Sequence, residues 1–149
     1  MIDIDQVSEI SIRYKPKIAK RPVVKSSNDC YQVLKCWFDE NTIHLQEQFV
    51  VMYLNQGNRV LGMLKLSTGG ITGTVADIRL ILAVALKAAA CSIIIAHNHP
   101  SGNLQPSKAD LDITRKLKAA SELMDIRLLD HLILNPDNEY LSLADEGHI

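Results

Sequence analysis

One stretch organises the expected architecture of this chain, namely residues 92–110, which read SIIIAHNHPSGNLQPSKAD. Its first five residues are apolar or small with β-branched residues in the middle, and they predict a buried strand that ends at His97. Two prolines and a glycine then interrupt regular structure. Ser107 and, three residues later, Asp110 have the spacing of a helix N-cap with an acidic partner. We therefore expect a helix to begin directly after the loop.

Three side chains of this stretch make a candidate metal site. Because side chains alternate along an extended chain, His97 and His99 are expected to point to the same side. Asp110 falls on the stripe that the following helix is expected to bury, which comprises Ile113, Leu117, Ala120 and Met124. Singly, a His-x-His pair is usually part of a polar loop, and an Asp at this position usually caps a helix. Together they predict a Zn²⁺ site whose fourth position is open to water, as in catalytic zinc sites.

The same residues resemble a known family. His97-x-His99-Pro100 followed by Ser107-x-x-Asp110 is similar to the JAMM motif of the JAB/MPN metalloprotease superfamily. The longer string HNHPSG at residues 97–102, with Thr114 and the string LDHLI at 129–133, resembles the RadC branch. The resemblance extends from about Ser26 to the C-terminus. It implies a single JAB/MPN-like α/β domain that acts as a zinc-dependent hydrolase on a peptide- or isopeptide-like carbonyl, so that the substrate would be a peptide or protein.

The resemblance also implies two catalytic residues. JAMM enzymes use an upstream glutamate as general base, and Glu47 fills that position at the head of the apolar run 48–54. Glu40 is a competitor, although it falls in a polar turn that favours a solvated side chain. Ser107 corresponds to the serine that donates a hydrogen bond to the developing oxyanion. As an N-cap its oxygen accepts from the helix, which leaves its proton free to donate.

Composition limits the other classes of function. The chain has 149 residues, 47% of them hydrophobic and 22% charged, with a net charge of −1, which is ordinary for one globular domain. Its most apolar stretch, residues 80–96, is interrupted by Lys87 and is too short for a transmembrane helix. Met1-Ile2-Asp3 begins an acidic stretch rather than a basic signal peptide. The three cysteines, Cys30, Cys36 and Cys91, form no Cys-x-x-Cys pair, so we expect mostly buried, reduced thiols in a cytoplasmic protein without membrane association.

The expected order of elements is that of a mixed β-sheet packed by helices. Strands are expected at 9–14, 47–54, 59–66, 92–97, 126–134 and 139–142, and helices at 29–38, 76–90 and from 107. A hairpin turn is expected at 55–58. The small-residue segment 67–74 could cradle a phosphate, but it lacks the ending of a P-loop, and a flexible connection with Thr74 capping the next helix is the better interpretation.

The N-terminal 25 residues are expected to form a strand and a basic arm before the domain at 26–149. The arm carries cations with no acid between them, at Arg13, Lys15, Lys17, Lys20, Arg21 and Lys25. Such an arm could contact nucleic acid, which is the alternative function: a RadC-type DNA-associated accessory protein, in repair or in a mobile element, with a structural or non-peptidolytic metal. Longer RadC proteins carry a helix-hairpin-helix region, and fewer than thirty residues precede the similar part here. The resemblance therefore supports the metal chemistry more strongly than DNA repair.

Two further points stay open at this level. His131 lies on an apolar strand, where it is either a satisfied core histidine or a partner that orients a metal ligand. Other zinc chemistries fit less well, because the chain has no His-Glu-x-x-His motif and no cysteine after Cys91 for the Pro-Cys-x-x-Cys of the deaminases.

Overall fold

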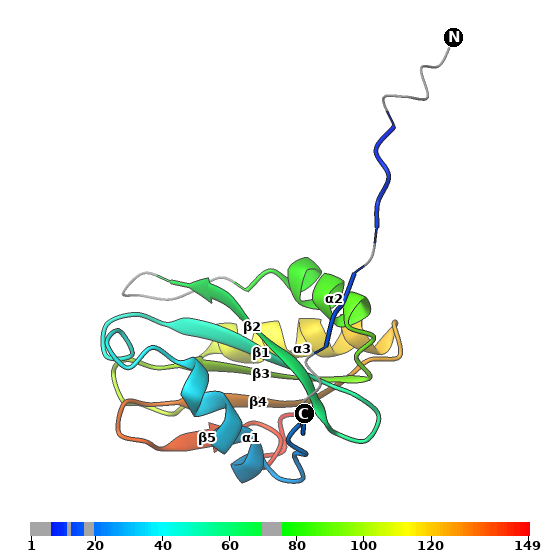
Figure 1. Cartoon of the computed structure of the whole chain (residues 1–149). Coiled ribbons are helices and arrows are strands. Elements are labelled where there is room, and N and C mark those ends of the chain that lie inside the picture. The colour runs from blue at the N-terminus through cyan, green and yellow to red at the C-terminus, as the bar shows by residue number, and fades with distance from the viewer. Residues whose placement is uncertain (1–6, 12, 17–19, 70–75) are drawn as a thin grey trace.

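The computed structural model describes residues 7–11, 13–16, 20–69 and 76–149 (Figure 1). Their centre is a mixed sheet of five strands in the order β2-β1-β3-β4-β5. The strands are β1 (Gln48–Leu54), β2 (Val60–Thr68), β3 (Ser92–Asn98), β4 (Arg127–Leu134) and β5 (Tyr140–Ser142). β3 and β4 pair parallel, and the other neighbours pair antiparallel. The predicted α/β class with a mixed sheet is confirmed.

Helices cover both faces of this sheet (Figure 1). The helices are α1 (Ser27–Leu34), which continues into the short 3₁₀ helix η2 (Lys35–Trp37), α2 (Ile78–Lys87) and α3 (Lys108–Glu122). α1 packs on one face and α3 with α2 on the other. The α-helices begin at polar N-caps whose side chains accept a backbone N–H, namely Ser26, Asp77 and Ser107. The expected cap Thr74 lies outside the described residues, and the cap of α2 is Asp77 instead.

Alternation along the central strands produces two cores, one on each face of the sheet. On β1 the side chains of Val50 and Met52 join the core under α1, whereas Phe49 and Val51 join the core under α2 and α3. Every residue of β1 and β3 is buried, as expected for central strands covered on both sides. The odd-numbered residues of β3, including His97, therefore face α3.

A register shift in β4 decides which of its side chains face α3. Ile93 pairs with Leu128, but Ile94 pairs with Asp130, so Leu129 is an extra residue at this point. Beyond the shift, Asp130 faces the α1 side, where it lines a cavity with Cys30 and Ser27, and His131 faces α3. Without the extra residue the two side chains would exchange faces.

The N-terminal segment differs from expectation. The described residues among 9–14 form no strand, so that prediction is wrong; Tyr14 instead donates its hydroxyl hydrogen bond to the Leu61 carbonyl of β2. Further along, Val23 pairs with Arg59 in an isolated bridge, and Val24 is 4% exposed. Residues 22–24 are thus packed against the β1–β2 hairpin, whose predicted turn at 55–58 is confirmed by the Asn58 N–H bond to the Asn55 carbonyl.

Several smaller expectations are also settled. The end of the predicted stripe on α3 is wrong, because Met124 follows the helix and is 46% exposed. The expectation of mostly buried thiols holds for Cys30, whereas Cys91 is half-buried and Cys36 is exposed; all three are free. Burial and the neighbouring Asp130 raise the pKa of the Cys30 thiol to about 12. Among the described residues, no helix is long and apolar enough to cross a membrane.

Candidate metal centre

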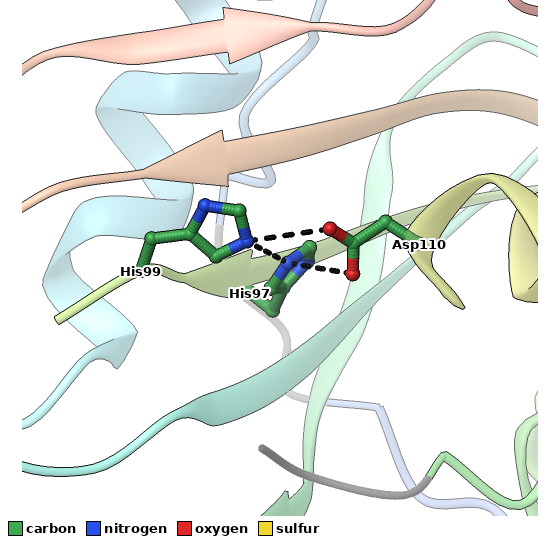
Figure 2. Close-up of side chains that lie close together, drawn as sticks. All are labelled: His97, His99 and Asp110. Atoms are coloured by element: carbon green, nitrogen blue, oxygen red, sulfur yellow. Dashed lines mark hydrogen bonds and ion pairs between the residues drawn. The ribbon is translucent and has the colours of Figure 1, made fainter. Parts of the chain in front are cut away.

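The candidate centre lies where β3 ends and α3 begins (Figure 2). His97 is the penultimate residue of β3 and is 1% exposed, with its ring stacked parallel to that of Phe49 at 6.1 Å between centroids. His99 follows the strand and continues its ladder, because its N–H donates to the Leu134 carbonyl of β4. Alternation along the extended chain therefore brings both rings to one side, as the sequence predicts.

Asp110 reaches the same point from α3. The helix begins with a complete capping box, in which the Ser107 hydroxyl accepts from the Asp110 N–H at 3.1 Å and the Asp110 carboxylate accepts from the Ser107 N–H at 2.7 Å. The box holds the carboxylate in the first turn, where it faces the two histidines. The capping and metal-site interpretations of Asp110 are thus compatible, since one oxygen of the carboxylate does the capping while both lie near imidazole nitrogens.

The three side chains fit a tetrahedral metal ion. The Nε2 atoms of His97 and His99 are 2.9 Å apart, and they lie 3.1 and 3.3 Å from the two carboxylate oxygens of Asp110. Ligand atoms at about 2.0–2.1 Å from Zn²⁺ in a tetrahedron lie about 3.3 Å from one another. Among the described residues, His97, His99 and Asp110 are the group whose ligand atoms all lie within 4.8 Å and could hold a metal ion.

Electrostatics keep Asp110 in the ionised form that a metal ligand needs, whereas the raised pKa of His99 favours its protonated form. Burial alone would raise the pKa of Asp110, but hydrogen bonds from His97 and His99 outweigh it and lower that pKa far below its usual range. Burial would likewise lower the pKa of His99, yet its bonds to Asp110 and to the Asn103 carbonyl raise it. His99 Nδ1 lies 2.6 Å from the Asn103 carbonyl, which can only accept, so Nδ1 carries the proton and leaves Nε2 for a metal when the ring is neutral.

Glu47 lies beside this group. It immediately precedes β1, is half-buried, and lines two cavities. One cavity, of about 210 Å³, also contains His97 and Asp110 in its wall, and the other, of about 290 Å³, contains His99 and Ser107. Glu40, the competitor from sequence, is exposed and lines a different cavity of about 400 Å³ with Tyr31 and Asn135. Of the two glutamates, Glu47 is therefore the one that lies beside the centre.

Asn98 is a residue of the centre that the sequence analysis missed. It stands between the two histidines, is 0% exposed, and points to the opposite face of the sheet. Its Nδ2 donates to the carbonyls of Ile43 and Gln46, and its Oδ1 accepts from the Gln48 N–H at 2.6 Å. These three bonds hold residues 43–48, which include Glu47, against β3, which carries His97. The sequence held one signal for this role: an Asn directly after a strand that is expected to be buried, where its polar groups need hydrogen-bond partners.

His131 is buried with 0% exposure and contacts the centre directly. Its Nε2 lies 2.8 Å from His97 Nδ1, and its Nδ1 lies 2.7 Å from the Thr114 hydroxyl. Burial and the neighbouring His97 lower the pKa of His131 well below its usual value, so that it is neutral at pH 7. Of the two interpretations left open, the contact with His97 favours the partner that orients a ligand.

Three cations of the basic arm line a cavity away from the centre. Lys15, Lys20 and Arg21 line a cavity of about 410 Å³ beside β2 and η2, together with Tyr14 and Trp37. Arg13 lies on the same arm, while Lys17 and residues 70–75 of the small-residue loop are outside the described residues. Lys15, Lys20 and Arg21 thus line a different cavity from the candidate metal ligands.

Comparison with known proteins points to one family. The RadC-like JAB domain family matches residues 24–148. A UPF0758 protein of Flavobacterium johnsoniae is 42% identical over 130 residues, which are 87% of this chain and 55% of that protein. Similar proteins of the same name occur in Porphyromonas gingivalis, 46% identical over 68% of this chain and 45% of that protein, and in Bacillus cereus, 36% identical over 85% and 54%. The chain spans about half the length of these curated relatives.

Proposed function

The chain belongs to the RadC-like JAB domain family, and on this basis we propose that it is a zinc-dependent hydrolase of the metallopeptidase type. The observation that carries the proposal is the convergence of His97, His99 and Asp110 beside the cavities that Glu47 lines. Two imidazoles and one carboxylate suit Zn²⁺ and leave a coordination position open. A zinc ion held by these three residues would supply an activated water and would polarise a carbonyl oxygen.

The residues around the ion then have distinct tasks. Glu47 accepts the proton of the attacking water and returns it to the leaving nitrogen, as its place at both cavities allows. Ser107 lines the cavity that also holds Glu47 and His99, and its hydroxyl proton is directed to the oxyanion that forms at the carbonyl. Phe49 and Ile113 complete the apolar wall of the smaller cavity and restrict the access of bulk water.

A peptide-library cleavage assay on the zinc-loaded protein tests this function. We expect cleavage that stops on addition of a chelator and returns with zinc. The Glu47→Gln variant should retain its zinc and lose at least about 10²-fold in rate, because it keeps the shape of the side chain but cannot accept a proton. A Glu40→Gln variant is the matched control and should cleave at the wild-type rate. Loss of zinc from Glu47→Gln, or full activity in that variant, would contradict the assigned role.

A second candidate function is contact with nucleic acid through the basic arm. One observation favours it: Tyr14 and Trp37, which are 39% and 38% exposed, line one cavity together with Lys15, Lys20 and Arg21. Exposed aromatic rings among cations suit single-stranded nucleic acid, whose bases stack while its phosphates pair with the cations. Binding of single-stranded DNA at several salt concentrations tests this, with Trp37→Ala and a chain shortened by residues 1–20 as variants. Shortening should stop before Pro22, because Val24 belongs to the core.

A further inference from the structure

We propose that His131 and Thr114 are positioning residues that fix the proton of His97 on Nδ1 and thereby preform the metal site. The proposal rests on the proposed function, since it concerns the ion that His97 would hold. It assigns a role to two buried polar side chains that the hydrolytic reaction itself does not use. His131 on β4 and Thr114 on α3 are 0% and 2% exposed; His131 contacts His97, and Thr114 contacts His131.

A series of hydrogen bonds runs from His97 through His131 and Thr114 to the backbone carbonyl of Asp110. The direction of each bond follows from this carbonyl. The Thr114 hydroxyl lies 2.6 Å from the backbone carbonyl of Asp110, which can only accept, so Thr114 must donate its single proton there. The Thr114 oxygen then accepts from His131, 2.7 Å away, and His131 Nδ1 must therefore carry a proton. A neutral ring with its proton on Nδ1 has an acceptor at Nε2.

The proton position on His131 in turn determines that on His97. His131 Nε2 accepts, and it lies 2.8 Å from His97 Nδ1, so that His97 donates from Nδ1. The lone pair of neutral His97 is then on Nε2, the atom that lies beside His99 and Asp110. His99 reaches the same state by a direct bond to the Asn103 carbonyl. Each histidine is thus oriented by a bond sequence that ends on a backbone carbonyl, which cannot reverse it.

Together with the contact between His97 and the Asp110 carboxylate, this series of hydrogen bonds begins and ends at Asp110. The carboxylate of Asp110 faces His97 Nε2, and the carbonyl of Asp110 ends the sequence that begins at His97 Nδ1. A displacement of α3 relative to β3 would therefore strain the carboxylate contact and the hydrogen bonds together. Partners of this kind fix the orientation of a ligating histidine, and their loss typically lowers metal affinity about 10–100-fold.

The register shift in β4 makes this contact available. It turns His131 toward α3 and His97, and it turns Asp130 to the other face. There the Asp130 carboxylate accepts from the His131 N–H, from the Ala144 N–H and from the Ser142 hydroxyl. Asp130 thus anchors the backbone of His131.

The decisive variant is Thr114→Val, which keeps the size and branching of the side chain and removes both hydrogen bonds of the hydroxyl. Zinc affinity, measured by competition with a chelating dye at constant pH, should fall about 10–100-fold. Thr114→Ser retains the hydroxyl and should remain within about threefold of wild type. Ser121→Ala is the matched control, because Ser121 is also buried on α3 and donates to a backbone carbonyl, that of Lys118, away from the centre.

Ring-nitrogen NMR gives a readout that requires neither zinc nor a variant. In the metal-free wild-type protein at a pH where the rings are neutral, His97 and His131 should both carry the proton on Nδ1. In Thr114→Val, His131 is released from this constraint and both tautomers should be observed. These tautomers would not change if Thr114 served packing alone.

Failure of this proposal can be distinguished from failure of the proposed function. A proton on Nε2 of either ring in wild type, wild-type zinc affinity in Thr114→Val, or an equal loss of affinity in Ser121→Ala would overturn the proposal. If Thr114→Val does not fold, the tautomers of the wild-type protein decide the question. If folded wild-type protein binds no zinc, the proposed function fails, and the tautomers still decide whether the hydrogen-bond sequence exists.

Discussion

Individual side chains at this centre serve both the fold and the site. Ser107 and Asp110 build the capping box of α3, and the same two residues face the cavity and the imidazoles. An N-cap position holds a side chain at a fixed place relative to the helix, because its oxygen is bound to a backbone N–H. The stability of α3 and the geometry of the centre are therefore linked through these atoms. A variant of either residue needs a control that removes an N-cap elsewhere in the protein.

The double role of Ser107 leads to a prediction with two readouts. Ser107→Ala should lower the free energy of unfolding by about 1 kcal/mol through loss of the cap. It should also lower the rate of hydrolysis about 10²–10³-fold through loss of the oxyanion donor. Ser26→Ala removes the equivalent cap of α1, whose oxygen accepts from the Asp29 N–H, and should affect stability alone. Equal rates in the two variants would remove Ser107 from the catalytic set.

Asp130 predicts a pH dependence of stability. Burial raises its pKa in the folded protein, and its three hydrogen bonds offset this only in part. The folded state therefore binds the proton more tightly than the unfolded state, whose pKa is about 3.9. The resulting stabilisation is complete below that pH and is lost as pH rises through the folded pKa.

In Asp130→Asn this dependence should disappear, since the amide oxygen can still accept from His131 and Ala144. Urea unfolding of both proteins at pH values from about 3.5 upward measures this dependence, because the pKa of Asp in the unfolded chain is about 3.9. The free energy of unfolding of the variant, relative to wild type, should increase with pH. A relative decrease would mean that the Asp130 carboxylate is stabilised, not destabilised, by its surroundings.

At the scale of elements, the centre is assembled by β3. Its odd-numbered residues face α3 and supply His97, whereas Asn98 faces α1 and holds the segment before β1. The strand pairs antiparallel with β1 and parallel with β4, so Glu47, the histidines and His131 reach one end of the sheet from different strands. The relative placement of base and ligands therefore depends on bonds between elements.

Asn98→Ala tests that dependence. It would leave the buried Gln48 N–H and the half-buried carbonyls of Ile43 and Gln46 without the side chain that binds them. Unpaired buried groups cost about 1–3 kcal/mol each, and with partial relaxation we expect about 2–4 kcal/mol in all by chemical denaturation. Asn41→Ala, an exposed change in the neighbouring turn, is the control and should cost under about 0.5 kcal/mol. A small effect of Asn98→Ala would mean that the Glu47 segment is held by other contacts.

The sequence predicted the parts of this centre that depend on local patterns. Alternation placed His97 and His99 together, and the cap signal placed Asp110 at the start of α3. It did not predict the role of His131, because the side that a strand residue faces depends on a register shift with a neighbouring strand. It also predicted a strand at 9–14, where the apolar alternation is short and Tyr14 bonds to β2 through its side chain instead.

At the scale of the molecule, the sheet separates two regions. The centre lies at the C-terminal end of β3, beside α3, β4 and the segment before β1, whereas Lys15, Lys20 and Arg21 of the arm line a cavity beside β2, at the edge of the sheet. The two cavities at the centre and the cavity beside β2 are lined by different charged groups. Hydrolysis and any contact with nucleic acid should accordingly respond to different variants, so that changes at Trp37 leave zinc content unaltered.

The most direct measurement is the metal content of the protein purified without chelator. We predict about one zinc per chain, and sharply lower content in His97→Ala, His99→Ala and Asp110→Ala. Asp29→Ala, which changes the acidic residue at the same position in the first turn of α1, is the control and should retain its zinc. Folded wild-type protein without a stoichiometric metal, or full zinc in the Asp110→Ala variant, would contradict the three-ligand centre.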